Sequence, residues 1–395
     1  MSMPAALARR RNYAGPALFS YGFRPFFLGG AAWAALGILL WLPQYHGELQ
    51  LPTALAPLDW HIHEMLYGYL AAVIAGFLLT AIPNWTGRLP INGAGLAALA
   101  SLWVAGRVAI LFSAKIGATA AALVDVGFLV IFAAVALREI IAGRNWRNLR
   151  VLVVLAILIV GNAVFHAEAI VHGAADYGVR IGIGAAIVLI MLVGGRIVPS
   201  FTHNWIARAN PGRLPRPFSR FDAASLAVAA FALSVWVVAP RHVLAGVFLL
   251  AAGLMHVVRL ARWAGDRTVA DPLVFVLHVG YGFVPAGFLL VGAAILWPAI
   301  VPSSAGIHAW TAGAIGLMTL AVMTRASLGH TGQALQAGPA TQAIYLCVVV
   351  AVLARIAAAF APHIVLLHVA AFAWAAAFLG FVLVYGPPLA RVRRA

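Results

Sequence analysis

The sequence contains very few charged residues for its length. Only 9% of the 395 residues are Asp, Glu, Lys or Arg, whereas 64% are hydrophobic. A soluble domain has about 25% charged residues and about half apolar ones. The chain therefore lacks the charge needed to cover a water-facing surface, which excludes a sizeable soluble domain and predicts an integral membrane protein.

Cysteine and lysine are nearly absent. The single cysteine, Cys347, lies in an apolar run, which excludes a disulfide framework, a four-cysteine zinc site and a cysteine-ligated iron–sulfur cluster. The 13 histidines are then the main candidate metal ligands. The net charge of +16 comes from arginines in short loops between apolar runs, so it indicates membrane topology and argues against a nucleic-acid partner.

Apolar runs fill nearly the whole chain, and a spanning helix needs roughly 20 apolar residues. The predicted fold is therefore all-α, a polytopic membrane helix bundle in which residues 1–395 form a single transmembrane domain. Twelve spans are predicted, at 24–43, 63–83, 94–113, 118–138, 150–172, 179–199, 221–240, 242–262, 272–297, 307–325, 340–361 and 363–385.

Basic residues are distributed unevenly among the predicted loops. With the amino terminus in the cytoplasm, 21 of the 26 lie on the inner side, and only Lys115, Arg180 and Arg241 lie outside. The remaining two, Arg107 and Arg355, lie within predicted spans. Because cytoplasmic loops carry the excess of Lys and Arg, both termini are predicted to be cytoplasmic. Three arginines at 9–11 precede the first span without a later small-residue cleavage site, so no cleavable signal peptide is expected.

The second and tenth spans align without gaps. Residues 63–87 and 308–332 both begin with histidine, share a glycine five residues later and end in Thr-Gly, and the Tyr-Gly-Phe-x-Pro motif at Tyr21 recurs at Tyr281. We interpret these matches as three tandem four-helix repeats, 17–143, 144–268 and 269–390, although shared membrane-helix composition can also produce such likeness. Repeats of this kind often place the functional site between units.

The densest polar stretch, Asp59-Trp-His-Ile-His-Glu-Met65, opens the second span. Ionisable residues inside a bilayer are costly and mark functional sites. His61 and Glu64 share a helix face, whereas His63 points elsewhere unless the first turn is not yet helical. Imidazoles suit copper, iron and zinc, and a nearby carboxylate completes or orients the set. The structural alternative is that Asp59 caps the helix and the histidines lie in the wet interface.

Other spans carry further candidate ligands. His166 lies within the fifth span, and His308 opens the tenth span at the position equivalent to His63. Both are candidate metal ligands. For His166 the alternative is a hydrogen bond between helices.

Four residues near the inner side are candidates for binding a cofactor. His278, with two glycines shortly after it, and His330 are candidates for a haem axial ligand or an inner site. Close helix packing explains the glycines equally well. Arg196 and Arg325 lie at the cytoplasmic ends of their spans and are candidates for pairing with haem propionates or another anion. Positive-inside anchoring is the alternative for both.

Several motifs along the chain resemble those of the NnrS family. They are Tyr21-Gly-Phe-Arg-Pro25-Phe, Asp59-Trp-His-x-His-Glu-Met65, Pro83-Asn-Trp-Thr-Gly87, Gly194-Gly-Arg-x-x-Pro199-x-Phe-Thr202, His278-x-Gly-Tyr281 and Met323-Thr-Arg-Ala-Ser-Leu-Gly-His-Thr-Gly332. The resemblance runs over essentially the whole chain. It implies a protein of the bacterial inner membrane that holds haem, expected to be b-type, and copper, and that is associated with denitrification and nitric oxide resistance.

The leading hypothesis is a haem–copper protein that binds nitric oxide at a metal site in the outer half of the membrane. His61, His63, His166 and His308 are predicted to build this site, with Glu64 as a proton donor or as the group that orients a ligand. Nitric oxide is small and apolar, so it can arrive through the lipid bilayer.

Two alternatives and one question stay open. A transporter of metal ions or small anions would use the histidines as transit sites. A relative of haem–copper oxidases and nitric oxide reductases would also have twelve spans, but the adjacent His-His pair of those enzymes is absent. Whether the protein is an oxidoreductase that reduces nitric oxide is undecided, because the sequence identifies no electron donor and only Glu64, Glu168 and Asp125 as candidate proton relays.

Overall fold

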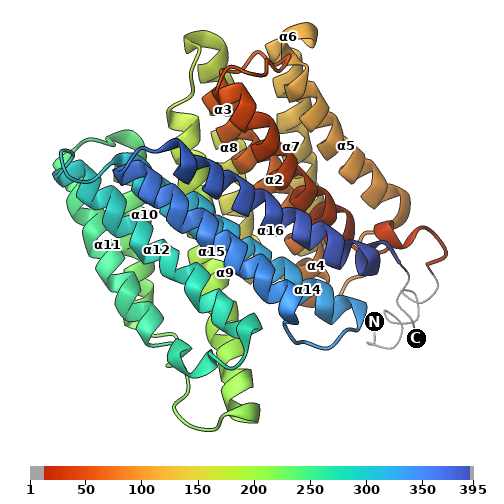
Figure 1. Ribbon diagram of the computed structural model, residues 1–395. Coiled ribbons are helices and arrows are strands. Elements are labelled where there is room, and N and C mark those ends of the chain that lie inside the picture. The colour runs from red at the N-terminus through yellow and green to blue at the C-terminus, as the bar shows by residue number, and fades with distance from the viewer. Residues whose placement is uncertain (1–12, 392–395) are drawn as a thin grey trace. The chain divides into compact units, whose positions relative to one another are not determined.

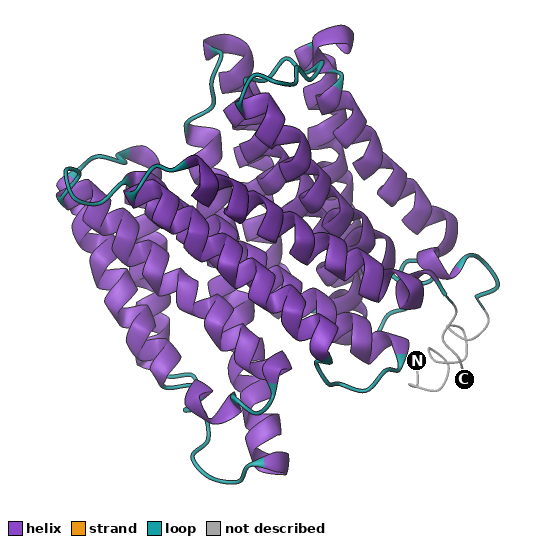
Figure 2. Cartoon of the chain, viewed as in Figure 1, coloured by secondary structure: helices purple, strands orange, loops and turns teal. Residues whose placement is uncertain are grey.

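The computed structural model describes residues 13–391, and every regular element in that range is a helix (Figure 2). The arginines at 9–11 lie outside the described residues. The α-helices and π-helical segments that form the main part of the chain are labelled as in Figure 1. They are α2 (Phe23–Tyr45), α3 (Pro57–His63), η2 (Glu64–Tyr69), α4 (Leu70–Thr86), α5 (Gly93–Leu111), α7 (Ala118–Ala142), α8 (Leu149–His172), α9 (Tyr177–Ala209), α10 (Arg220–Val238), α11 (Val243–Ala261), α12 (Pro272–Leu296), α13 (Ser303–His308), η5 (Ala309–Leu317), α14 (Met318–Thr331), α15 (Pro339–Phe360) and α16 (Ile364–Ala390). The short elements are η1 (Ala17–Phe19), α6 (Ser113–Ile116), η3 (Trp146–Asn148) and η4 (Gly265–Thr268).

Within residues 13–391, 12 helical segments are long and apolar enough to cross a membrane. Each overlaps one span predicted from the sequence, so the all-α fold and the twelve spans are confirmed. The second segment joins α3, η2 and α4 into 30 residues, and the tenth joins α13, η5 and α14 into 29. The largest difference is α9, which continues ten residues beyond the predicted end because its polar tail remains helical.

The chain divides into two compact units. Among the described residues, unit 1 contains 13–182, 326–333 and 378–391, and unit 2 contains 183–325 and 334–377. The three sequence repeats stay a prediction.

In unit 1, α2 packs against α4, and α7 packs against α4, α5 and α8. The aromatic side chains of Phe23, Phe26 and Phe27 on α2 are fully buried. Gly76 on α4 permits this close approach, because a Cβ there would lie 2.8 Å from the Phe27 ring. Small residues at such crossings bring membrane helices close together.

The second and tenth spans each contain a π-helical segment at the same register. Residues Glu64–Tyr69 follow His63 directly, and residues Ala309–Leu317 follow His308 directly. These two histidines are the pair that the sequence alignment matches. Single π-helical turns inside α-helices occur frequently at functional sites, so both positions are candidates for function.

Unit 2 contains a buried charged cluster of its own. The Arg259 side chain, which is 2% exposed, donates to Asp222 Oδ1 at 3.3 Å and to the Tyr281 hydroxyl at 2.7 Å. The Tyr281 oxygen lies 3.0 Å from His256 Nδ1. Arg259, Asp222 and the Tyr281 hydroxyl thereby have polar partners within apolar helices, as burial requires.

The first and last spans of unit 1 lie side by side at one end. Arg24 Nη1 donates to the carbonyl oxygens of Leu389 at 2.7 Å and Arg391 at 2.8 Å. Arg24 lies at the start of the first span and Leu389 at the end of the twelfth, so both spans meet the same membrane surface. That this surface faces the cytoplasm stays a prediction from the arginine distribution.

Candidate metal centre

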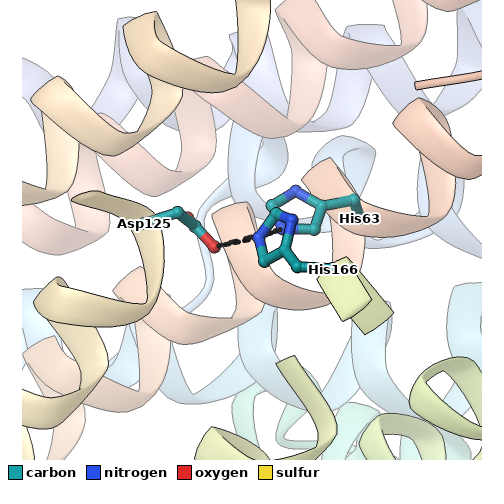
Figure 3. A group of neighbouring side chains, drawn as sticks. All are labelled: His63, Asp125 and His166. Atoms are coloured by element: carbon teal, nitrogen blue, oxygen red, sulfur yellow. Dashed lines mark hydrogen bonds and ion pairs between the residues drawn. The ribbon is translucent and has the colours of Figure 1, made fainter. Parts of the chain in front are cut away.

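Three potential metal ligands converge inside unit 1 (Figure 3). His63 is the last residue of α3, Asp125 lies on α7 and His166 lies on α8. His63 Nε2 lies 3.2 Å from His166 Nε2, and each of these nitrogens lies 3.1 Å from Asp125 Oδ2. The three residues are buried, with exposed fractions of 0%, 1% and 5% for His63, Asp125 and His166.

Glu64 determines which ring nitrogen of His63 carries the hydrogen. Glu64 Oε1 lies 2.9 Å from His63 Nδ1, and an ionised carboxylate can only accept hydrogen bonds. The Nδ1–H of His63 therefore donates to Glu64, which leaves the Nε2 lone pair directed at the group. A carboxylate that orients a histidine in this way is common beside metal ions. The other oxygen, Glu64 Oε2, accepts a hydrogen bond from Trp33 Nε1 at 2.5 Å.

Arg107 on α5 joins the two carboxylates. Its Nη1 donates to Glu64 Oε1 at 2.7 Å, and its Nη2 donates to Asp125 Oδ1. Because Arg107 occupies Oδ1, the other oxygen of Asp125 faces the two imidazoles. Gly68 makes room for this arrangement, since a Cβ there would lie 2.6 Å from Arg107 Nη1 and 3.0 Å from Glu64 Oε2.

Asn162 on α8 completes the polar surroundings. Its Nδ2 donates to Asp125 Oδ2 at 2.7 Å, which turns its Oδ1 toward His63 Nε2 at 3.2 Å. Three atoms with lone pairs, His63 Nε2, Asp125 Oδ2 and Asn162 Oδ1, therefore face one another in a buried space. Such an arrangement repels itself unless a proton or a metal cation lies among the lone pairs.

The donor set fits a first-row transition metal ion. Zinc–nitrogen and zinc–oxygen bonds of about 2.0–2.1 Å in a tetrahedron place donor atoms about 3.3 Å apart, and the separations here are 3.1–3.2 Å. Two imidazoles with one carboxylate suit copper, iron or zinc. His63, His166 and Asp125 are thus able to hold such an ion after shifts of a few tenths of an ångström.

A family model described as NnrS protein matches residues 17–393 of the chain. The chain belongs to the NnrS family. A comparison with curated proteins found no match. Membership of the NnrS family supports a general role related to nitric oxide.

The structure brings together two of the four metal ligands predicted for this NnrS-family chain, His63 and His166. His61 stacks on Trp41 with ring centroids 4.3 Å apart and is not part of the convergent group. His308 belongs to unit 2, where its Nδ1–H donates to the Ser304 carbonyl oxygen at 2.7 Å. For His61 and His308, ligation stays a prediction.

Both ring nitrogens of His278 lie close to neighbouring groups of unit 2. The Thr202 hydroxyl oxygen lies 2.8 Å from the Val198 carbonyl oxygen and 2.7 Å from His278 Nε2. The other nitrogen, Nδ1, faces Gly265, and a Cβ added to Gly265 would lie only 2.5 Å from this nitrogen. Haem ligation by His278 stays a prediction.

The other candidate cofactor residues make ordinary packing contacts. The His330 ring lies 5.4 Å from the Tyr21 ring and 5.3 Å from the Phe23 ring. The Arg325 guanidinium lies over the Phe201 ring at 4.1 Å, and Arg196 is exposed. Haem binding by these residues stays a prediction.

Arg107, Asn162 and Trp33 belong to the centre but were not predicted from the sequence. Arg107 offered a signal, because an arginine within a membrane span is rare and marks a functional site. Asn162 and Trp33 gave none, since an uncharged polar group within a span indicates only a hydrogen bond between helices. Glu168, a candidate proton relay, instead accepts the backbone N–H groups of residues 176–178 at the start of α9, at 2.9–3.0 Å.

Proposed function

We propose that this NnrS-family protein holds a copper ion at His63, His166 and Asp125 and binds nitric oxide there. The observation that carries the proposal is the convergence of two imidazole nitrogens and one carboxylate oxygen within 3.1–3.2 Å in a buried group. The family's link to nitric oxide supports the choice of ligand, and the resemblance described above supports copper. The proposed location is the bacterial cytoplasmic membrane, with the centre in its outer half.

The surroundings of the centre suit a small apolar ligand. His63 and Glu64 have no exposed surface, and the apolar rings of Tyr67 and Phe165 pack within 5.6 Å and 5.2 Å of the His63 ring. Nitric oxide crosses lipid and helix packing more readily than an ion does. A reduced copper ion held at the centre would supply an electron-rich site to which nitric oxide binds.

The protein side chains in this proposal keep the ligand atoms in place. Glu64 holds the Nδ1 proton of His63, Arg107 holds both carboxylates, and Asn162 restrains Asp125. All contacts of Glu64 hold it in position: Oε1 faces His63 and Arg107, and Oε2 faces Trp33. We therefore propose Glu64 as a positioning residue of this centre.

Infrared spectroscopy of the reduced, copper-loaded protein in mild detergent tests this function. Nitric oxide should give one N–O stretching band that shifts when ¹⁵N replaces ¹⁴N. The band should disappear in His166→Ala and persist in His172→Ala, a matched control at the exposed end of the same helix. A band of equal intensity in His166→Ala, or no band in the copper-loaded native protein, contradicts the proposal.

A further inference from the structure

The metal centre contains two carboxylates and one guanidinium. Glu64 and Asp125 are 0% and 1% exposed, and Arg107 is 2% exposed. With both histidines acting as neutral ligands, the group has one net negative charge. Burying a net charge away from water is unfavourable even after the protein relaxes.

From this charge balance we infer that Arg107 makes the centre selective for a monovalent metal cation. The inference rests on the proposed function, because it concerns the ion held at the same centre. A cation of charge +1 makes the buried group neutral, whereas a divalent cation leaves a net charge of +1. Without Arg107 the group would have a charge of −2, and a divalent cation would then be the one that neutralises it.

The charge of Arg107 acts in addition to its hydrogen bonds. The guanidinium contacts one oxygen of each carboxylate, and Asp125 Oδ2 faces the two histidines. Lysine at this position keeps the charge and loses the two-pronged geometry. Methionine keeps much of the volume and loses the charge. The two substitutions therefore separate the electrostatic effect of Arg107 from its positioning effect.

The size of the effect follows from Coulomb's law. At an effective dielectric constant of about 20, a unit charge about 6 Å from the ion changes the affinity by about a hundredfold for each unit of cation charge. A variant that alters the charge therefore changes the ratio of divalent to monovalent affinity by about a hundredfold. Because this ratio is compared between variants, the intrinsic preference of imidazole for one metal cancels.

The experiment measures dissociation constants of Ag⁺ and Zn²⁺ for the purified full-length protein in mild detergent. These two ions have filled d shells, so no oxidation or reduction complicates the titration. The native protein should bind one Ag⁺ more tightly than Zn²⁺. In Arg107→Met the ratio of Zn²⁺ to Ag⁺ affinity should rise about a hundredfold, whereas in Arg107→Lys it should stay within about threefold of the native value.

Glu64→Gln provides a second test of opposite sign. This substitution removes one negative charge beside the centre, and the glutamine amide occupies the same volume as the carboxylate. Both affinities should fall, and the ratio of Zn²⁺ to Ag⁺ affinity should fall about a hundredfold. This variant keeps the inference falsifiable if Arg107→Met does not fold.

The outcomes distinguish this inference from the proposed metal centre. If both ions bind the native protein and require His63 and His166, yet the affinity ratio is the same in Arg107→Met and Glu64→Gln, the inference is wrong and the centre stands. A ratio that changes equally in Arg107→Lys and Arg107→Met also overturns it, since geometry then sets the preference. If neither ion binds, or binding survives His63→Ala with His166→Ala, both the centre and the inference are wrong.

Discussion

At the scale of single residues, Trp33 supports a proposed metal ligand without being a ligand itself. Its indole N–H donates to Glu64, which holds His63. We expect Trp33→Phe to keep all proposed ligands but to weaken copper binding about 10–100-fold, as loss of such outer contacts does elsewhere. Competition with a copper chelator measures this change. Trp41→Phe is the control on the same helix, because its indole nitrogen has no hydrogen-bond partner.

A substitution at Arg259 in unit 2 tests whether a buried charge stabilises the fold. Arg259→Leu leaves the 4% exposed Asp222 side chain with Arg262 as its remaining cationic partner. Breaking a buried pair by removing one partner costs about 3–5 kcal/mol, so the thermal unfolding temperature should fall markedly. Arg213→Leu breaks a pair whose side chains are 56% and 66% exposed, and it should cost about 0–1 kcal/mol. Equal losses in both variants would contradict this role.

The choice between His61 and His63 could not be made from the sequence. Helical spacing places His61 with Glu64 on one face, yet Glu64 contacts the neighbouring His63. The partners that decide the choice, Asp125 and Asn162, lie about 60 and 100 residues away in sequence. Hydrophobic runs predict each helix, because length and composition suffice for spanning a membrane. They do not predict which faces of different helices meet.

At the scale of elements, the backbone of the π-helical segment η2 lies against side chains of the metal centre. Gly68 lies in this segment, and a Cβ there would contact Arg107 Nη1 and Glu64 Oε2. We expect Gly68→Ala to displace both side chains and to lower copper binding at least tenfold. Gly127→Ala on α7 is the control, since a Cβ there meets nothing within 4 Å. Copper binding that is equal in the two variants would show that the packing at Gly68 does not support the centre.

At the scale of the whole molecule, orientation in the membrane is the feature that the sequence predicts most directly. The arginine bias predicts that the α2–α3 loop is outside and the α7–α8 loop inside. In a Cys347→Ser background, a membrane-impermeant maleimide should label Glu48→Cys on intact cells. It should label Arg147→Cys only after the membrane is opened, since both positions are exposed in their loops. The reverse pattern would invert the topology and put the metal centre in the inner half.

Copper content per chain tests the central claim most directly. The purified protein is loaded with copper, freed of loosely bound metal and analysed for metal and protein. The native protein and His172→Ala should each hold about one tightly bound copper per chain. His63→Ala, His166→Ala and Asp125→Ala should hold less than about a tenth of that, because each removes a ligand atom. Copper retained equally in all three ligand variants, or absent from the native protein, would contradict this claim.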